Sequence, residues 1–306
     1  MIKVPKTTTA FLVLMLAYCG ISRSQECNYI TDYYQLVYQA QVDYLEHNYE
    51  LAFRKLKKAE SNCKLLNQQC IDEMVLLAVL YEKFGKKDTA FEYLHRLLKK
   101  GFPFERLINH KEVSDLKSYP EWQVLKDKST TYASNFEKKI DKDLKEEVEQ
   151  LIEEFKLLTS GRYTFKSTHV IDSITENQIS RILRRKGYPI PANIGFERKI
   201  HGSFELLFTR VKDTGYFKQI LLGYIKRGKG NPWSIGIMFD AHMGIREKNY
   251  KETKFLYGMA DNLDSSYIKD FRNVDKRRVA IGLSPWSLRR KLLKLKGQGE
   301  FLENLE

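Results

Sequence analysis

The stretch from residue 31 to residue 100 contains no proline and repeats its own pattern of small and apolar residues after 38 positions. Ala40 and Ala52 in the first copy correspond to Ala78 and Ala90 in the second, so each copy carries two small residues 12 positions apart. Apolar residues recur between them at helical spacing. Because two antiparallel helices need small side chains where their axes come closest, the sequence predicts two consecutive helical hairpins.

This pattern resembles the tetratricopeptide repeat family, whose copies are helix–turn–helix units with small residues at fixed places. The resemblance implies a helical-repeat module over residues 25–135 that binds a protein or peptide partner. A spacer that only supports its neighbour is the alternative. The matching positions are Leu36, Ala40, Ala52, Leu56 and Ala59 in the first copy, and Ala78, Tyr81, Ala90 and Leu94 in the second.

The first 24 residues have the pattern of a secretory signal peptide. Lys3 and Lys6 precede an apolar run over residues 10–21, and the small residues Ser22 and Ser24 follow it. The run is shorter than the ~20 residues that a membrane-spanning helix needs. We therefore expect cleavage after Ser24 and a periplasmic or secreted protein that is soluble once the signal peptide is removed. An uncleaved N-terminal anchor is the alternative.

Export makes disulfides chemically accessible, and cleavage would leave three cysteines. These are Cys27, Cys63 and Cys70. One internal pair can form, and a cysteine spacing alone does not fix which. We expect Cys63 to pair with Cys70 across a short polar loop, and three unpaired thiols are the alternative. Their spacing matches no zinc site.

The formal net charge of +13 belongs to the C-terminal half, because residues 156–306 hold 29 basic and 15 acidic side chains. Since an exported protein seldom meets nucleic acid, we do not expect nucleic acid as a partner. An anionic membrane surface or an acidic glycan is the alternative to a protein partner. A third possibility is that the final helix packs on its own domain and exposes its basic side to solvent, in which case the positive charge needs no partner. The basic surface is expected at Arg184, Arg185, Lys186, Arg277, Arg278, Arg289, Arg290 and Lys291.

The C-terminal half reads as an α+β domain over residues 159–306, after a charged connecting helix over residues 136–158. Helices are expected at 175–187, 203–212, 216–226 and 284–296, the first ending at Gly187. Two short aromatic and aliphatic segments, residues 233–239 and 254–257, are predicted as strands. The fold class expected for the whole chain is therefore α+β, with helical hairpins first and a small β element later.

The order of motifs between about residues 146 and 296 is similar to that of a bacterial exported domain family of unknown function. That family runs Gly-Trp/Tyr-Pro, Val/Ile-Gly, Gln-His-x-Asp, Asp-Arg, Tyr-Gly-Thr and Arg-Arg…Gly-Leu. The matching residues here are Gly187-Tyr188-Pro189, Ile194-Gly195, Asp240, Tyr257-Gly258, Arg277-Arg278 and Gly282-Leu283. The resemblance implies a shared fold.

The departures from that family fall on its polar positions. Val211 stands where the family has histidine, Ala241 follows Asp240 where it has arginine, and Met259 replaces its threonine. We therefore lean towards a protein that is not an enzyme, and we expect neither a metal nor a cofactor. The alternative is a hydrolase that uses Asp240 with His242 or His201. The candidate catalytic residues are Asp240, His242, His201, Arg210 and Tyr257.

Overall fold

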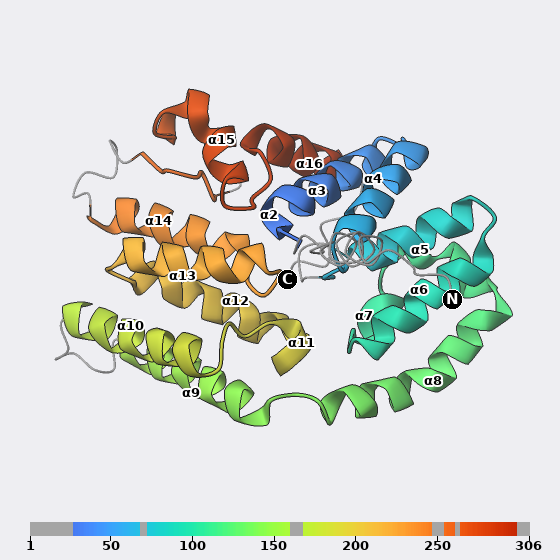
Figure 1. The fold of residues 1–306 in the computed structure, drawn as a ribbon, viewed down its shortest axis with the longest axis horizontal. Helices are drawn as coiled ribbons and strands as arrows, with labels where there is room; N and C mark the ends of the chain where they lie inside the picture. The colour runs from blue at the N-terminus through green and yellow to red at the C-terminus, as the bar shows by residue number, and fades with distance from the viewer. Residues whose placement is uncertain (1–26, 68–71, 160–167, 247–253, 261–263, 299–306) are drawn as a thin grey trace, which may run out of the picture.

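The computed structural model describes residues 27–67, 72–159, 168–246, 254–260 and 264–298 (Figure 1). Within those ranges every regular element is an α-helix or a short 3₁₀ helix. One isolated parallel bridge joins Phe255 to Ile268, where the backbone N–H of Lys269 donates to the Phe255 carbonyl at 2.9 Å. The described chain is therefore all-helical, and the predicted α+β fold with a β element is wrong.

The error lies at residues 233–239, which belong to helix α14 (Pro232–Arg246) instead of a strand. All five residues from 234 to 238 are buried, so this part of the helix is buried around its whole circumference. A short apolar run of this kind has the same periodicity in a buried strand and in a buried helix. The second predicted strand, residues 254–257, contributes only Phe255 to the isolated bridge.

Two helical hairpins lie where the 38-residue spacing places them. The first consists of α3 (Tyr34–Leu45) and α4 (Tyr49–Asn62), preceded by the single turn α2 (Tyr29–Asp32). The second consists of α5 (Glu73–Lys83) and α6 (Lys87–Lys99). The turns contain His47 and Gly85, both in left-handed backbone conformations with φ of 61° and 71°. The four alanines that define the spacing, Ala40, Ala52, Ala78 and Ala90, are completely buried.

The chain then passes through α7 (Phe104–Ile108) and two 3₁₀ turns to α8 (Pro120–Glu137), which packs along α6. The predicted connecting helix over residues 136–158 is instead the separate helix α9 (Lys142–Thr159). Asp141 causes the break, because its Oδ1 accepts a hydrogen bond from the backbone N–H of Leu144 at 2.9 Å and begins the new helix there.

The C-terminal half is a layered set of helices around α14. They are α10 (Thr168–Arg185), α11 (Pro191–Ile194), α12 (Arg198–Leu207), α13 (Thr214–Lys226), α15 (Val274–Val279) and α16 (Trp286–Gln298). Helix α14 packs against α12, α13 and the 3₁₀ turn Phe208–Arg210, while α9 packs against α10 and α12. Gly187, with a φ of 90°, stands just after α10 as expected.

The last helix returns to the first hairpin, so that α16 lies beside α3 in Figure 1. Lys291 on α16 forms an ion pair with Glu46 at the end of α3, with 2.6 Å between the charged atoms. Just before α16, the Leu283 carbonyl accepts a hydrogen bond from Gln35 Nε2 at 2.9 Å. One hydrophobic core extends through both halves of the described chain.

Candidate functional site

Asp240, the first of the candidate catalytic residues, lies in α14 and is only 6% exposed. Its Oδ1 accepts a hydrogen bond from the backbone N–H of Tyr257, and its Oδ2 accepts one from that of Met259, both at 2.8 Å. Burial raises the pKa of the Asp240 carboxyl, and the two N–H donors partly offset this by favouring its ionised form. Both carboxylate oxygens therefore hold the backbone of residues 257–259.

Arg278 lies on the other side of the same turn and is 1% exposed. Its guanidinium donates hydrogen bonds to the backbone carbonyls of Tyr257 at 2.6 Å and Ser284 at 2.7 Å. Burial lowers the pKa of Arg278 to about 10, so the group is still charged at neutral pH. The prediction that Arg278 belongs to a basic surface is wrong, because this arginine is buried and donates its hydrogen bonds to backbone carbonyls inside the protein.

His242 does not share a face with Asp240. Both residues lie on α14, where residues two apart point in different directions. In the part of the chain that the structure describes, no three His, Cys, Asp or Glu side chains are grouped as metal ligands would be.

The remaining catalytic candidates serve separate contacts. His201 is buried, its Nε2 lies 2.7 Å from the Gly195 carbonyl, and burial lowers the pKa of the imidazole. Arg210 lies with its Nη1 3.9 Å from an oxygen of Asp172. Of the five predicted residues, only Asp240 and Tyr257 come together, and the contact there is made by the Tyr257 backbone.

Two glutamates in apolar surroundings were missed by the sequence argument. Glu73 is 1% exposed, and its Oε1 accepts hydrogen bonds from the Tyr33 hydroxyl and from the backbone N–H of Asn67. Burial raises the pKa of Glu73 to about 7. Glu205 accepts a hydrogen bond from Asn231 Nδ2 at 2.6 Å, and burial raises the pKa of its carboxyl to about 7. A single acidic residue leading an otherwise apolar helix is the sequence pattern that would have found Glu73.

A third missed group is His110, which connects the second hairpin to the segment after α7. Its Nε2 lies 3.6 Å from Asp72, and its Nδ1 lies 2.5 Å from Glu112. Burial lowers the pKa of His110, but the two carboxylates outweigh burial and raise the pKa to about 9. The imidazole is therefore positively charged at neutral pH and joins two acidic side chains.

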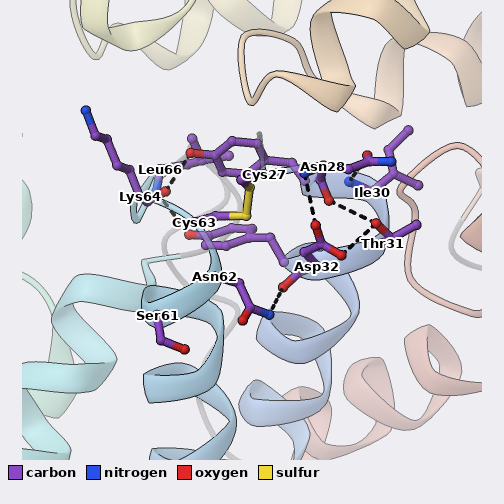
Figure 2. Close-up of a disulfide and its surroundings, with 12 residues drawn as sticks. Cys27, Asn28, Ile30, Thr31, Asp32, Ser61, Asn62, Cys63, Lys64 and Leu66 are labelled. Carbon is purple, nitrogen blue, oxygen red and sulfur yellow. Dashed lines mark hydrogen bonds between the residues drawn. A yellow bond between two sulfur atoms is a disulfide. The ribbon is translucent and has the colours of Figure 1, made fainter. Parts of the chain in front are cut away.

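Cys63 forms a disulfide with Cys27, and their Cα atoms are 5.5 Å apart (Figure 2). The predicted Cys63–Cys70 pairing is wrong, and Cys70 itself lies outside the described residues. The turn α2 folds back across the end of α4, where the carbonyl of Asp32 accepts a hydrogen bond from Asn62 Nδ2 at 2.9 Å. This contact between distant segments brings Cys27 to Cys63, and a count of residues between cysteines does not reveal it.

The disulfide also fixes the loop that follows α4. The hydroxyl of Tyr29, two residues after Cys27 in the chain, donates a hydrogen bond to the Lys64 carbonyl at 3.0 Å. The Leu66 backbone N–H donates to the Tyr33 hydroxyl at 3.0 Å. Residues 63–67 are therefore held between α2 and the buried carboxyl of Glu73, which the same Tyr33 hydroxyl contacts.

Aromatic rings form a continuous row between the two hairpins, and the row reaches the surface at Phe84, which is 37% exposed. The ring centroid of Phe53 lies 5.3 Å from that of Phe84 and 4.9 Å from that of Tyr81. Tyr81 in turn stacks on Tyr93 with 5.2 Å between centroids. Such spacings are typical of favourable aromatic pairs.

Cations lie along the other end of this row. Lys57 Nζ lies 5.9 Å from the centroids of both Tyr81 and Tyr93, and the Arg96 guanidinium lies 4.7 Å from Tyr93. Lys100 Nζ donates a hydrogen bond to the carbonyl of Leu65, in the loop that the disulfide fixes. We call the whole arrangement the α4–α6 strip, and its members are Phe53, Lys57, Lys64, Tyr81, Phe84, Tyr93, Arg96 and Lys100.

The basic cluster at the end of α10 is partly engaged. Arg184 Nη2 donates to the Tyr216 hydroxyl at 2.6 Å, and Lys186 Nζ lies 3.7 Å from an oxygen of Asp141. Arg185 is exposed and lines a shallow polar depression between α9 and α10. This cluster is a surface with mixed charge, because acidic side chains of α9 lie beside it.

The basic residues near the C-terminus are also used within the protein. Arg277 donates hydrogen bonds to three nearby backbone carbonyls. On α16, Lys291 pairs with Glu46, while Arg289 and Arg290 are only half-exposed. The final helix therefore packs on the first hairpin and keeps part of its basic side accessible.

The predicted signal peptide, with its cleavage after Ser24, lies outside the described residues. Among the helices that the structure does describe, none is both long and apolar enough to cross a membrane. Comparison with known proteins adds nothing further: no family matches the chain, and neither a curated protein nor a solved structure is significantly similar to it.

Proposed function

We propose that this chain is an exported, non-enzymatic interaction protein whose helical hairpins bind a partner protein through the α4–α6 strip. The observation that carries the proposal is the way the chain occupies one side of its first hairpin and leaves the other side open. The strip combines an exposed aromatic ring with cations, which are the residue types that mark contact surfaces between proteins.

The occupied side is a face of α3. The Tyr34 hydroxyl donates a hydrogen bond to the Gly230 carbonyl, and the Tyr38 hydroxyl donates one to the Gly282 carbonyl, both at 3.3 Å. Eight residues after Tyr38, Glu46 pairs with Lys291. Since residues four apart share one side of a helix, the C-terminal half covers this side of α3 along its length. A partner of the hairpins must therefore bind elsewhere.

The open side is formed by α4 and α6. Exposed side chains on these two helices include Arg54, Lys58, Glu92 and Arg96, and the main packing partners of α4 are its neighbours α3 and α5. The residues from 51 to 62 of α4 span about 16 Å at ~1.5 Å per residue. That length accommodates about five residues of an extended peptide.

The hydrolase alternative has less support. Its central residue, Asp240, uses both carboxylate oxygens for backbone N–H groups, and His201 contacts the Gly195 carbonyl. A catalytic carboxylate needs an oxygen that can reach a substrate or a water molecule. The Asp240 contacts fit the task of holding a turn much better than that of moving a proton.

Site-specific photo-crosslinking tests the proposal on the full chain. A photoreactive residue at Lys58, exposed on α4, is compared with one at the exposed Glu146 on α9. We expect the residue at Lys58, and not the control residue, to give a discrete adduct with one protein that mass spectrometry identifies reproducibly. Phe84→Asp should reduce the yield of this adduct at least fivefold. Equal adducts from both positions, or a Lys58 adduct unaffected by Phe84→Asp, would contradict the proposal.

A further inference from the structure

The end of the α4–α6 strip beside the disulfide concentrates positive charge. Burial lowers the pKa of the Lys100 ammonium, and repulsion from Arg96 and Lys64 lowers it further, although Glu73 acts in the opposite direction. Arg96 and Lys100 are one turn apart at the end of α6, and Lys64 directly precedes Leu65, whose carbonyl accepts a hydrogen bond from Lys100, so both other cations lie close to Lys100. Such a cluster is costly for the free protein and favours binding of an anion.

One acidic side chain on α4, Glu60, forms ion pairs with cations of the strip. Glu60 lies 2.5 Å from Lys57 Nζ and 3.3 Å from Arg96 Nη1, and it also accepts a hydrogen bond from the Tyr93 hydroxyl. Its pKa is lowered by these partners against the effect of burial. Among the described residues, no carboxylate lies within ion-pair distance of Lys64 or Lys100, so Glu60 offsets only part of the charge.

The opposite end of the strip is apolar. Phe84 is 37% exposed and rests against Phe53, which carries the row of rings on towards Tyr81. An exposed ring whose inner side is packed on other rings presents a fixed apolar surface to a ligand. Among the members of the strip, the two phenylalanines therefore lie at one end, and Lys64, Arg96 and Lys100 lie at the other.

This arrangement of an exposed aromatic ring and cations fits some classes of anionic partner better than others. A sulfated glycan or an anionic lipid surface carries charge throughout, so it would place charge against the exposed Glu92 of α6 and the carboxylate of Glu60. It would also leave Phe84 without an apolar contact. A polypeptide can present an apolar side chain at one point and carboxylates a few residues later.

We propose that the α4–α6 strip binds an extended segment of a partner polypeptide, with an apolar residue on Phe84 and carboxylates on Lys64, Arg96 and Lys100. This inference rests on the proposed function and specifies the chemistry of the partner. The disulfide contributes to recognition, because Cys63 precedes Lys64 and the loop carbonyl of Leu65 positions Lys100.

Fluorescence anisotropy with synthetic peptides tests the chemistry. The probe is a labelled peptide of one phenylalanine, one leucine and three glutamates, and its control carries glutamines in place of the glutamates. We expect the glutamate peptide to bind the full chain at least 10-fold more tightly than the glutamine peptide. Affinity should fall at least fivefold when salt rises from about 50 to about 300 mM, because the contacts are ionic.

The variants Lys64→Glu and Arg96→Glu should each weaken the glutamate peptide at least 10-fold. Lys226→Glu, which makes the same charge change at an exposed position on α13, should leave it within twofold. Far-UV circular dichroism shows that each variant is folded. An equal effect of Lys226→Glu, or binding of heparin or phosphatidylglycerol vesicles with the same dependence on Arg96, would overturn the inference.

The two tests separate the two proposals. If Lys58 crosslinks a partner and Phe84→Asp prevents it while the glutamate peptide does not bind, the surface is correct and the acidic chemistry is wrong. If neither experiment gives a signal above its control, both the proposed function and this inference are wrong.

Discussion

Asp240 and Arg278 hold the same short turn from opposite directions: the carboxylate accepts hydrogen bonds from the N–H groups of Tyr257 and Met259, and the guanidinium donates to the Tyr257 carbonyl. Neither residue is within an open site. Asp240, a candidate catalytic residue in the sequence, instead holds a segment without regular structure against α14. Removing either side chain would leave buried backbone groups of this turn without their hydrogen-bond partners.

Arg278→Ala should therefore destabilise the protein strongly, by about 3–5 kcal/mol in the free energy of unfolding, because several buried carbonyls lose their donor. The neighbouring variant Arg277→Ala is the matched control, because Arg277 also donates to backbone carbonyls but is partly exposed. We expect it to cost about 1–2 kcal/mol. Urea denaturation of both variants measures the difference, and equal costs would show that the burial of Arg278 is unimportant.

Breaking the disulfide should also weaken the fold. Cys27 and Cys63 close a loop across 36 positions, and a loop of this size corresponds to about 3–4 kcal/mol of stabilisation in the chain-entropy description. Cys27→Ser and Cys63→Ser should each show this loss in thermal or urea denaturation. Cys70→Ser should not, and peptide mapping of the oxidised protein should find Cys27 linked to Cys63. A Cys63–Cys70 peptide in its place would contradict the structure.

Stability should fall as the pH rises from about 5 to about 7, because of Glu73. Its carboxyl has a pKa of about 7 in the folded protein against 4.5 as its ordinary value, so the folded state holds the proton more tightly. The stabilisation is complete below the lower value and is lost as the pH rises through the higher one. We expect a decrease on the order of 2 kcal/mol in the free energy of unfolding.

Glu73→Gln should flatten this part of the pH profile, since an amide does not titrate. Glu205→Gln is the matched variant, because burial raises the pKa of Glu205 to about 7 as well. The two changes should act additively, as distant sites normally do. A profile of Glu73→Gln that is parallel to that of the unmodified protein would contradict the prediction.

Alanine variants of two glycines with left-handed backbone distinguish the cost of conformational strain from the cost of steric overlap. Gly85 has a φ of 71° and open space around it, whereas Gly101 has a φ of 92° and lies against the Phe136 ring. Gly85→Ala should cost about 1–2 kcal/mol, from strain alone. Gly101→Ala should cost more, by about 1–3 kcal/mol, because the new methyl group would overlap the ring. Thermal denaturation of both variants measures the difference, and equal losses would contradict it.

The parts of the fold that local patterns determine could be predicted from the sequence. Small residues such as Ala40 and Ala78 are required where two helices touch, and a glycine such as Gly85 or Gly187 permits the backbone that ends a helix. Each of these requirements acts within one or two turns of the chain. The two hairpins and the end of α10 follow from them.

The errors lie where distant segments decide the outcome. Residues 234–238 are buried on all sides because other helices surround α14, and a buried strand would need the same residues. Arg278 can be buried because distant backbone carbonyls accept its hydrogen bonds, and Cys63 pairs with Cys27 because α2 folds back over α4. No pattern in the neighbouring sequence indicates any of these contacts between distant segments.

The return of α16 to α3 has a consequence for the order of events during synthesis. The first hairpin and its Cys27–Cys63 bond are contained in the first 63 residues, so they can form early. The partners of Tyr38 and Glu46, however, are Gly282 and Lys291, which are made more than 200 residues later. Until then that side of α3 is bare, and a chaperone or a second nascent chain can occupy it. Completion of the native fold therefore waits for nearly the whole chain, which makes truncated chains the ones most prone to associate.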